Sequence, residues 1–94
     1  MFVLITYDVN TENSEGKRRL RKVAKTCVNY GHRVQNSVFE CEMDASTCRL
    51  VKEILLGIID QGKDSLRFYY LGKNRKREHY GIKPSFDVTA PMIM

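Results

Sequence analysis

The order of apolar patterns along the chain is the feature that most constrains its fold. A continuous apolar run over residues 2–8, rich in β-branched side chains, predicts a buried strand. Apolar residues then recur at helical spacing and predict a helix over residues 16–30. The candidate N-caps of this helix are Thr11, Asn13 and Ser14. A second helical repeat over residues 50–58 follows Asp44 and Ser46, either of which can cap it.

The segments on either side of the second repeat have the character of strands. Residues 33–43 change their apolar face after residues 35–37, so a tight turn or bulge is expected to divide two short strands there. Residues 66–70 alternate between unlike faces and predict one further strand. The resulting order, β-α-β-β-α-β, is typical of the α+β ferredoxin-like fold, in which both helices cover one side of an antiparallel sheet.

The end of the chain is expected to contain a basic loop over residues 72–77 and then an apolar tail over residues 82–94. The tail has too many apolar residues to stay uncovered, and its prolines suit an edge strand but exclude a central one. We therefore expect an extra C-terminal strand that pairs with the sheet of a partner subunit in a homodimer. With 94 residues, the chain 1–94 forms one domain.

Charge points to a polyanionic partner. The formal net charge is +5, and six of the sixteen basic residues lie in 17–25, with four more in 73–77. On the first predicted helix, Arg18, Arg21, Lys22 and Lys25 fall within an arc of about 100° opposite the apolar face. Such a face can be merely solvated, but its charge density favours contact with phosphates. Phosphate contacts alone read no base sequence.

The composition gives no sign of a membrane protein or of a disulfide framework. No apolar run approaches the ~20 residues that a membrane-spanning helix needs. Cys27, Cys41 and Cys48 are odd in number and lack metal-ligand spacing, so free thiols in a reducing cytoplasm are expected. Cys27 lies on the apolar face of the first predicted helix, where a buried free thiol is expected. His32 and His79 are isolated, which favours turn or surface roles over catalysis.

Asp8 is the candidate site residue, because it stands where the first strand meets a polar loop. A carboxylate there can stabilise a turn, or it can hold a hard cation beside the basic helix for metal-assisted phosphodiester chemistry. One carboxylate is a poor Mg²⁺ site by itself. A twofold homodimer would bring two copies of Asp8 together and supply the pair.

Three segments resemble a known family: residues 5–9 (ITYDV), 19–25 (RLRKVAK) and 33–40 (RVQNSVFE). They are similar to the small CRISPR-associated adaptation nuclease, the Cas two family. Two later segments, 64–72 (DSLRFYYLG) and 83–87 (KPSFD), resemble its type I-C branch. The resemblance covers nearly the whole chain in the right order.

The resemblance implies a ferredoxin-like homodimer whose C-terminal strand crosses to the other subunit. Members of the family are metal-dependent endonucleases of single-stranded RNA, double-stranded DNA or both, and they bridge two dimers of the Cas one integrase during spacer capture. Asp8 matches the metal-binding aspartate, so two copies would hold one Mg²⁺ or another divalent cation. The phosphate-binding positions fall on Arg18, Arg19, Arg21, Lys22 and Arg33. Positions that border the cleft match Tyr7, Ser37 and Phe39.

Other functions stay open at this point. With one carboxylate per subunit and no evident general base, cleavage is expected to be weak or conditional, which leaves room for a non-catalytic nucleic-acid-binding scaffold. A ribonuclease toxin of the VapD type shares the fold and the dimer but should not need the Cas one partner. A ferredoxin-like regulatory domain that binds a ligand is the third alternative, and the basic helix argues against it.

Overall fold

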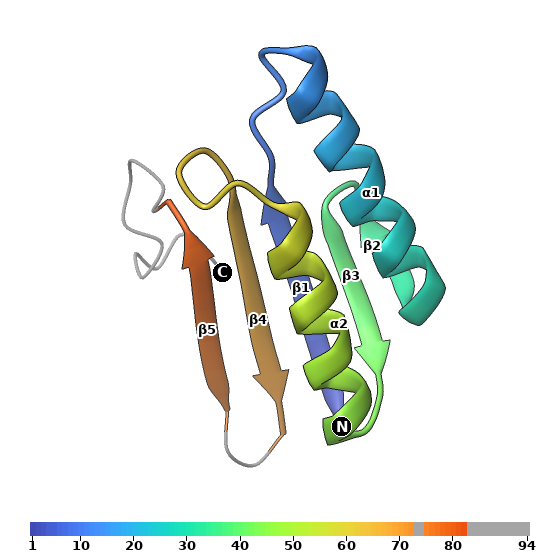
Figure 1. Cartoon of the computed structure of the whole chain (residues 1–94). Coiled ribbons are helices and arrows are strands. Elements are labelled where there is room, and N and C mark those ends of the chain that lie inside the picture. Colours follow the sequence, from blue (N-terminus) through green and yellow to red (C-terminus); the bar gives the residue numbers. More distant parts are fainter. Residues whose placement is uncertain (73–74, 83–94) are drawn as a thin grey trace.

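The computed structural model describes residues 1–72 and 75–82. The elements follow one another as β1 (Phe2–Asp8), α1 (Ser14–Tyr30), β2 (His32–Gln35), β3 (Val38–Glu42), α2 (Ala45–Ile58), β4 (Ser65–Leu71) and β5 (Lys76–Gly81). The strands form one antiparallel sheet in the order β2-β3-β1-β4-β5 (Figure 1). The predicted ferredoxin-like α+β fold is therefore confirmed, and the sheet has a fifth strand, β5, at its edge.

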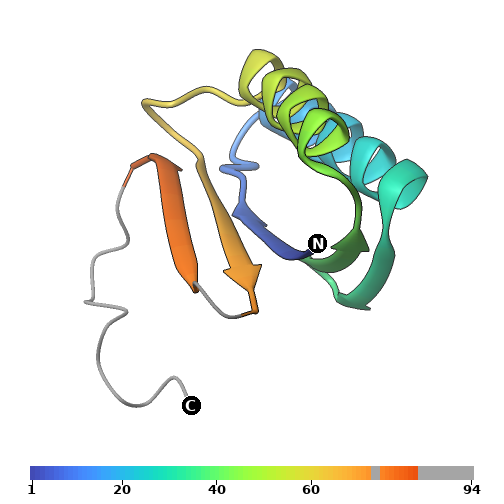
Figure 2. The ribbon, with the colours of Figure 1, turned by 90° about the horizontal axis from the view of Figure 1, so that it is seen from below.

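Both helices pack on one face of the sheet, so the molecule has two layers (Figure 2). The central strand β1 alternates between the layers, because successive side chains of a strand point to opposite faces. Val3, Ile5 and Tyr7 are buried in the core under the helices, whereas Phe2 and Asp8 are exposed. The sheet thus has a covered face and, on its other side, a helix-free face to which Asp8 belongs.

Side-chain caps fix where each helix begins. The side-chain oxygen of Asn13 accepts a hydrogen bond from the Gly16 N–H at 2.8 Å, and Asp44 Oδ1 accepts one from the Thr47 N–H at 2.8 Å. Both are the Asx-type N-caps that leave fewer orphan donors in the first turn. Hydrogen bonds from Thr47 lower the pKa of the Asp44 carboxyl. Two of the predicted capping residues are thereby confirmed.

The segment after β4 differs from the expected basic loop over residues 72–77. Strand β5 already begins at Lys76 and pairs with β4 of the same chain, from Tyr70 opposite Lys76 to Ser65 opposite Gly81. The pairing uses the backbone groups along the open edge of β4, and Tyr80 packs edge-on against Phe68. The tail predicted to pair with a partner lies outside the described residues, apart from Ile82.

The three cysteines are free, as predicted, and Cys41 and Cys48 are buried as well as Cys27. Burial raises the pKa of the Cys27 thiol to about 12, which keeps it protonated at neutral pH. In the part of the chain that the structure describes, neither helix is long and apolar enough to cross a membrane.

Candidate active site and nucleic-acid interface

Asp8 is exposed at the end of β1, directly opposite Ser65 at the start of β4. A small pocket of about 200 Å³ opens beside it. The pocket is lined by Asp8, Asn10, Lys63, Ser65 and Ile82. Three separate parts of the chain therefore meet at this carboxylate: the loop after β1, the start of β4 and the end of β5.

The donor set of this pocket suits a hard cation only in part. Asp8 has a carboxylate and Ser65 a hydroxyl, which are ligand types that Mg²⁺ accepts together with water. The amide oxygen of Asn10 already accepts a hydrogen bond from the Glu12 N–H at 2.9 Å. Among the described residues, however, no group of three or more His, Cys, Asp or Glu side chains comes together to hold a metal. One chain thus supplies a single carboxylate, that of Asp8, to this pocket, and Lys63 adds a cation to its wall.

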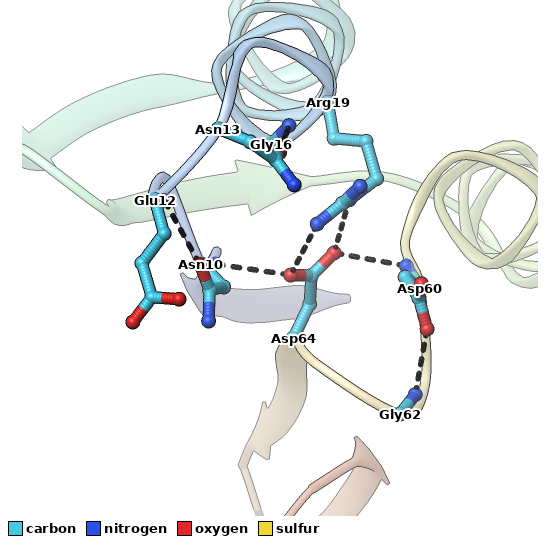
Figure 3. Close-up of polar contacts among 8 residues, drawn as sticks. All are labelled: Asn10, Glu12, Asn13, Gly16, Arg19, Asp60, Gly62 and Asp64. Atoms are coloured by element: carbon cyan, nitrogen blue, oxygen red, sulfur yellow. Dashed lines mark hydrogen bonds and ion pairs between the residues drawn. The ribbon is translucent and has the colours of Figure 1, made fainter.

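A buried carboxylate, Asp64, lies beneath the loop that follows Asp8 (Figure 3). Its side chain is fully buried, and both of its oxygens accept hydrogen bonds. Arg19 of α1 donates through Nε to Oδ2 at 2.8 Å and through Nη2 to Oδ1 at 3.2 Å. The backbone N–H groups of Asn10 and Asp60 donate to the remaining positions at 3.0 and 2.9 Å. A buried charge with this many donors is fully compensated.

Electrostatics keeps this pair ionised. Burial alone would raise the pKa of the Asp64 carboxyl, but the hydrogen bonds from Arg19, Asp60 and Asn10 outweigh it and hold the pKa below its ordinary value. The hydrogen bond with Asp64 in turn raises the pKa of the Arg19 guanidinium. Asp64 is therefore a carboxylate, not a carboxylic acid, at neutral pH.

The predicted phosphate-binding cations of α1 fall into two groups. Arg18, Arg21 and Lys22 are exposed, as a solvent-facing basic surface requires. The guanidinium of Arg19 instead points to Asp64, and its side chain is only 15% exposed. The structure therefore gives Arg19 an internal contact, and it leaves the other three available to a nucleic acid. We call Arg18, Arg21, Lys22 and the equally exposed Lys25 the basic face of α1.

The remaining predicted site residues gather on the other side of the sheet from Asp8. The rings of Tyr7 and Phe39 stack with centroids 6.2 Å apart, and the guanidinium carbon of Arg33 lies 5.0 Å from the Phe39 centroid. The Tyr7 N–H donates to the carbonyl oxygen of Ser37 at 3.2 Å. The structure places both rings inside the core, where burial raises the pKa of the Tyr7 phenol, rather than at an open cleft. Tyr7 and Asp8 are adjacent in sequence but face opposite layers.

Four residues around Asp8 were missed by reasoning from the sequence: Asn10, Lys63, Asp64 and Ser65. In the sequence, Asp64 is only the last residue of the turn that ends the second helical repeat. The available signal was its position immediately before a strand that pairs with β1, since this pairing brings Ser65, the next residue, opposite Asp8. The partner of Asp64, Arg19, is 45 positions away, and nothing local distinguishes it from its basic neighbours.

A second ion pair lies under α2 and shares no residue with the Asp8 pocket. Lys52 Nζ is 2.6 Å from Glu78 Oε1, and the hydroxyl groups of Tyr70 and Tyr80 donate to the same oxygen at 2.9 and 3.3 Å. The Lys52 ammonium also lies over the rings of Phe68 and Tyr70. This cluster ties α2 to β4 and to the edge strand β5.

Similarity to known proteins decides the family. Residues 1–79 match the family described as CRISPR associated protein Cas2. The chain belongs to this family. The solved structure of Cas2 from Streptococcus pyogenes, crystallised at pH 6.5, is 59% identical with a TM-score of 0.72, covering 79% of this chain and 89% of that one.

Curated Cas2 relatives match over almost their whole length. The CRISPR-associated endonuclease Cas2 of Halalkalibacterium halodurans is 57% identical, with 99% of both chains covered. The CRISPR-associated endoribonuclease Cas2 of Nitratidesulfovibrio vulgaris is 52% identical, covering 100% of this chain and 94% of the relative. These names assign nuclease activity to the relatives, and they differ in whether RNA is specified.

Proposed function

We propose that this Cas2 chain is an endonuclease of RNA, double-stranded DNA or both, whose metal site is built on Asp8. The observation that carries the proposal is the exposed Asp8 carboxylate at the end of a central strand, beside a small polar pocket that also contains Lys63. A carboxylate held on a rigid strand end can keep a divalent cation in a fixed position. The names of the close relatives support the same activity.

Mg²⁺ is the proposed cofactor, with other divalent cations as substitutes. When bound, such an ion polarises a phosphate group and makes water a stronger nucleophile. Asp8 would supply the carboxylate ligand, and the amide of Asn10 and the hydroxyl of Ser65 lie in the same pocket. The Lys63 ammonium can neutralise charge on a phosphate that enters the pocket. Because each chain contributes one carboxylate, the slow or conditional cleavage expected from the sequence fits this site.

The nucleic acid is proposed to lie along the basic face of α1. This face carries exposed cations on a helix that begins, after a short loop, at the end of the sheet where β1 ends (Figure 1). Long flexible cations bind phosphates without reading bases, so binding should not depend on sequence. Arg33, which is exposed on the edge strand β2, is a further candidate contact.

A homodimer is proposed because the helix-free face of the sheet exposes apolar side chains. Phe2 and Leu71 stand opposite each other in the β1–β4 register and are 47% and 44% exposed. Burying such a pair between two copies is favourable, at about 25 cal/mol per Å² of apolar surface removed from water. Asp8 lies on the same face, so a twofold pairing there is the arrangement that would bring two Asp8 carboxylates together.

The second proposed role is structural: the dimer bridges the Cas one integrase during spacer acquisition. The exposed cations of the basic face of α1 favour this role, because none of them lines the Asp8 pocket. Bridging needs surface contacts and a grip on phosphates, and neither depends on a bound cation. A cytoplasmic location and membership of a type I-C-like branch complete the proposal, the latter on the strength of the segments 64–72 and 83–87.

The proposed function is tested by incubating pure protein with labelled RNA and duplex DNA, with and without Mg²⁺, over a series of pH values. Cleavage that requires both the metal and Asp8 is the expected result. Cleavage that is equal with a chelator present would remove the metal from the proposal. Binding without any cleavage, under all of these conditions, would leave the scaffold as the function.

A further inference from the structure

The pocket at Asp8 is organised around a residue that does not line it. Of the other four residues in its wall, two are the chain neighbours of Asp64, and two are hydrogen-bonded to it. The Asn10 N–H donates to Asp64 Oδ1 at 3.0 Å, and the Ile82 N–H donates to the Asp64 backbone carbonyl at 2.9 Å. Every wall residue apart from Asp8 is therefore attached directly to Asp64.

The loop after Asp8 is also constrained by two contacts that do not involve Asp64. Asn10 Oδ1 accepts a hydrogen bond from the Glu12 N–H at 2.9 Å, so the asparagine closes its own turn. The carbonyl of Asn10 packs so closely on the first turn of α1 that a Cβ at Gly16 would lie 1.9 Å from its oxygen. Asp8 itself pairs with Ser65 of β4. Two residues later, the Asn10 N–H is bonded to Asp64 (Figure 3), so the chain is fixed at Asp8 and again just after it.

The geometry points to Asp64, with Arg19 as its partner, as a positioning residue for the Asp8 site. This inference rests on the proposed function, because it gives Asp64 a role at the Asp8 carboxylate. A carboxylate is required, since four donors converge on its two oxygens from the loop after β1, from α1 and from the turn after α2. An asparagine would present its own N–H donors to some of these groups and leave buried donors unsatisfied.

A purely structural role is the competing explanation, because losing a buried ion pair destabilises any domain. The two explanations differ in where the effect appears. If Asp64 is a positioning residue, replacing it speeds hydrogen exchange at the Asn10 amide and slows turnover while the protein is still folded. A purely structural role lowers the melting temperature, speeds exchange at Asn10 no more than at other protected amides, and leaves the turnover rate unchanged below the transition.

The first measurement is amide hydrogen exchange at Asn10, in metal-free protein, for the unmodified chain and for Asp64→Asn. Asn10 should be well protected in the unmodified chain, and Asp64→Asn should speed its exchange by about tenfold or more, since it removes a charge-assisted hydrogen bond. Glu78→Gln is the matched control, because it breaks the ion pair with Lys52, which shares no residue with the Asp8 pocket. The control should leave exchange at Asn10 unchanged.

The second measurement is the rate of Mg²⁺-dependent cleavage by the same variants, well below their melting temperatures. Asp64→Asn should lower kcat by about tenfold with KM for nucleic acid nearly unchanged, because the reacting groups move while the basic face of α1 stays exposed. Glu78→Gln should keep kcat. If Asp64→Asn does not fold, Arg19→Lys replaces it, since lysine keeps the charge but cannot form the forked hydrogen bonds.

The outcomes separate this inference from the proposed function. Unchanged Asn10 exchange or unchanged kcat in the folded Asp64→Asn protein would overturn the positioning role, even if Asp8→Asn is inactive. Equal losses of kcat in Asp64→Asn and Glu78→Gln would also overturn it, in favour of a general effect of destabilisation. If Asp8→Asn itself keeps full activity, the proposed site fails, whatever Asn10 does.

Discussion

The Arg19 guanidinium and the Asp64 carboxylate form a forked ion pair, with Nε–Oδ2 at 2.8 Å and Nη2–Oδ1 at 3.2 Å. This ion pair joins the first half of α1 to the residue before β4, immediately beneath the loop that follows Asp8. The ion pair engages the Arg19 guanidinium in an internal contact. The cations of the basic face of α1 stay exposed, where they can contact phosphates.

Binding to duplex DNA should depend steeply on salt and not on sequence. Replacing Arg18, Arg21 and Lys22 by Ala should flatten the slope of log affinity against log salt by about 0.9 for each phosphate that the variant no longer neutralises. Filter binding or fluorescence anisotropy over a salt series measures the slope. Arg49→Ala, which removes an exposed cation from α2, is the control and should leave the slope almost unchanged. A triple variant with the original slope would move the interface, with residues 73–77 as the next candidates.

Stability should fall in acid partly because of Asp64. Its pKa is lower in the folded chain than in the unfolded one, so the unfolded state binds more protons as the pH falls below about 4. The stabilisation is complete above the unfolded pKa and is lost as the pH drops through the folded pKa. Thermal melts between pH 2 and 7 should therefore show a shallower acid decline for Asp64→Asn than for the unmodified chain. Parallel curves would mean that Asp64 does not titrate differently on folding.

Gly81 should tolerate no side chain. Its φ is +93°, and a Cβ there would lie 2.0 Å from the carbonyl oxygen of Asp64. Gly81→Ala should lower the free energy of unfolding by about 1–3 kcal/mol, because it adds both backbone strain and a clash. Gly57→Ala in α2 is the matched control. A Cβ added at Gly57 would meet nothing within 4 Å, and the substitution should raise the free energy of unfolding by about 0.5–1 kcal/mol. Denaturant unfolding measures both, and equal effects would contradict the close approach at Gly81.

The chain should be a dimer in dilute solution. Removing residues 83–94 should weaken the dimer, because the apolar tail is predicted to pair with the partner subunit; Ile82 is kept because its N–H bonds to Asp64. Sedimentation velocity over a concentration series measures the dissociation constant. A truncated protein with the same dissociation constant would show that the tail does not contribute. In that case Phe2 and Leu71 on the helix-free face become the residues to replace.

Much of the fold followed from the sequence because its signals are local. The helical repeats and the caps Asn13 and Asp44 depend on neighbours a few positions away, and each was confirmed. The turn expected within residues 35–37 was also found, at residues 36–37, with Gln35 still in β2. Strand β5 was missed because its sequence, from Lys76 to Gly81, shows no apolar alternation. It forms on the open edge of β4, and only the assembled sheet provides that edge.

The site was harder to predict because it is made by residues that are distant in sequence. Asp8 was identifiable from its place at the end of an apolar strand. Asp64 was not, since its role appears only when the β1–β4 pairing brings it under the loop after Asp8. Likewise, nothing in the run of α1 cations shows that Arg19 points inward, because its partner lies in another part of the chain. The strict alternation of β1, in contrast, already separates Tyr7 from Asp8.

The cleavage rate of Asp8→Asn tests the proposed metal site most directly. Asparagine keeps the shape of the side chain and removes the charge that a hard cation needs. Mg²⁺-dependent cleavage should fall to the level of a chelated control, while the dimer and the melting temperature stay nearly the same. Glu12→Gln, which removes an exposed carboxylate from the same loop, should cleave at the original rate. Full cleavage by pure Asp8→Asn protein would contradict the assignment of this residue as the metal site.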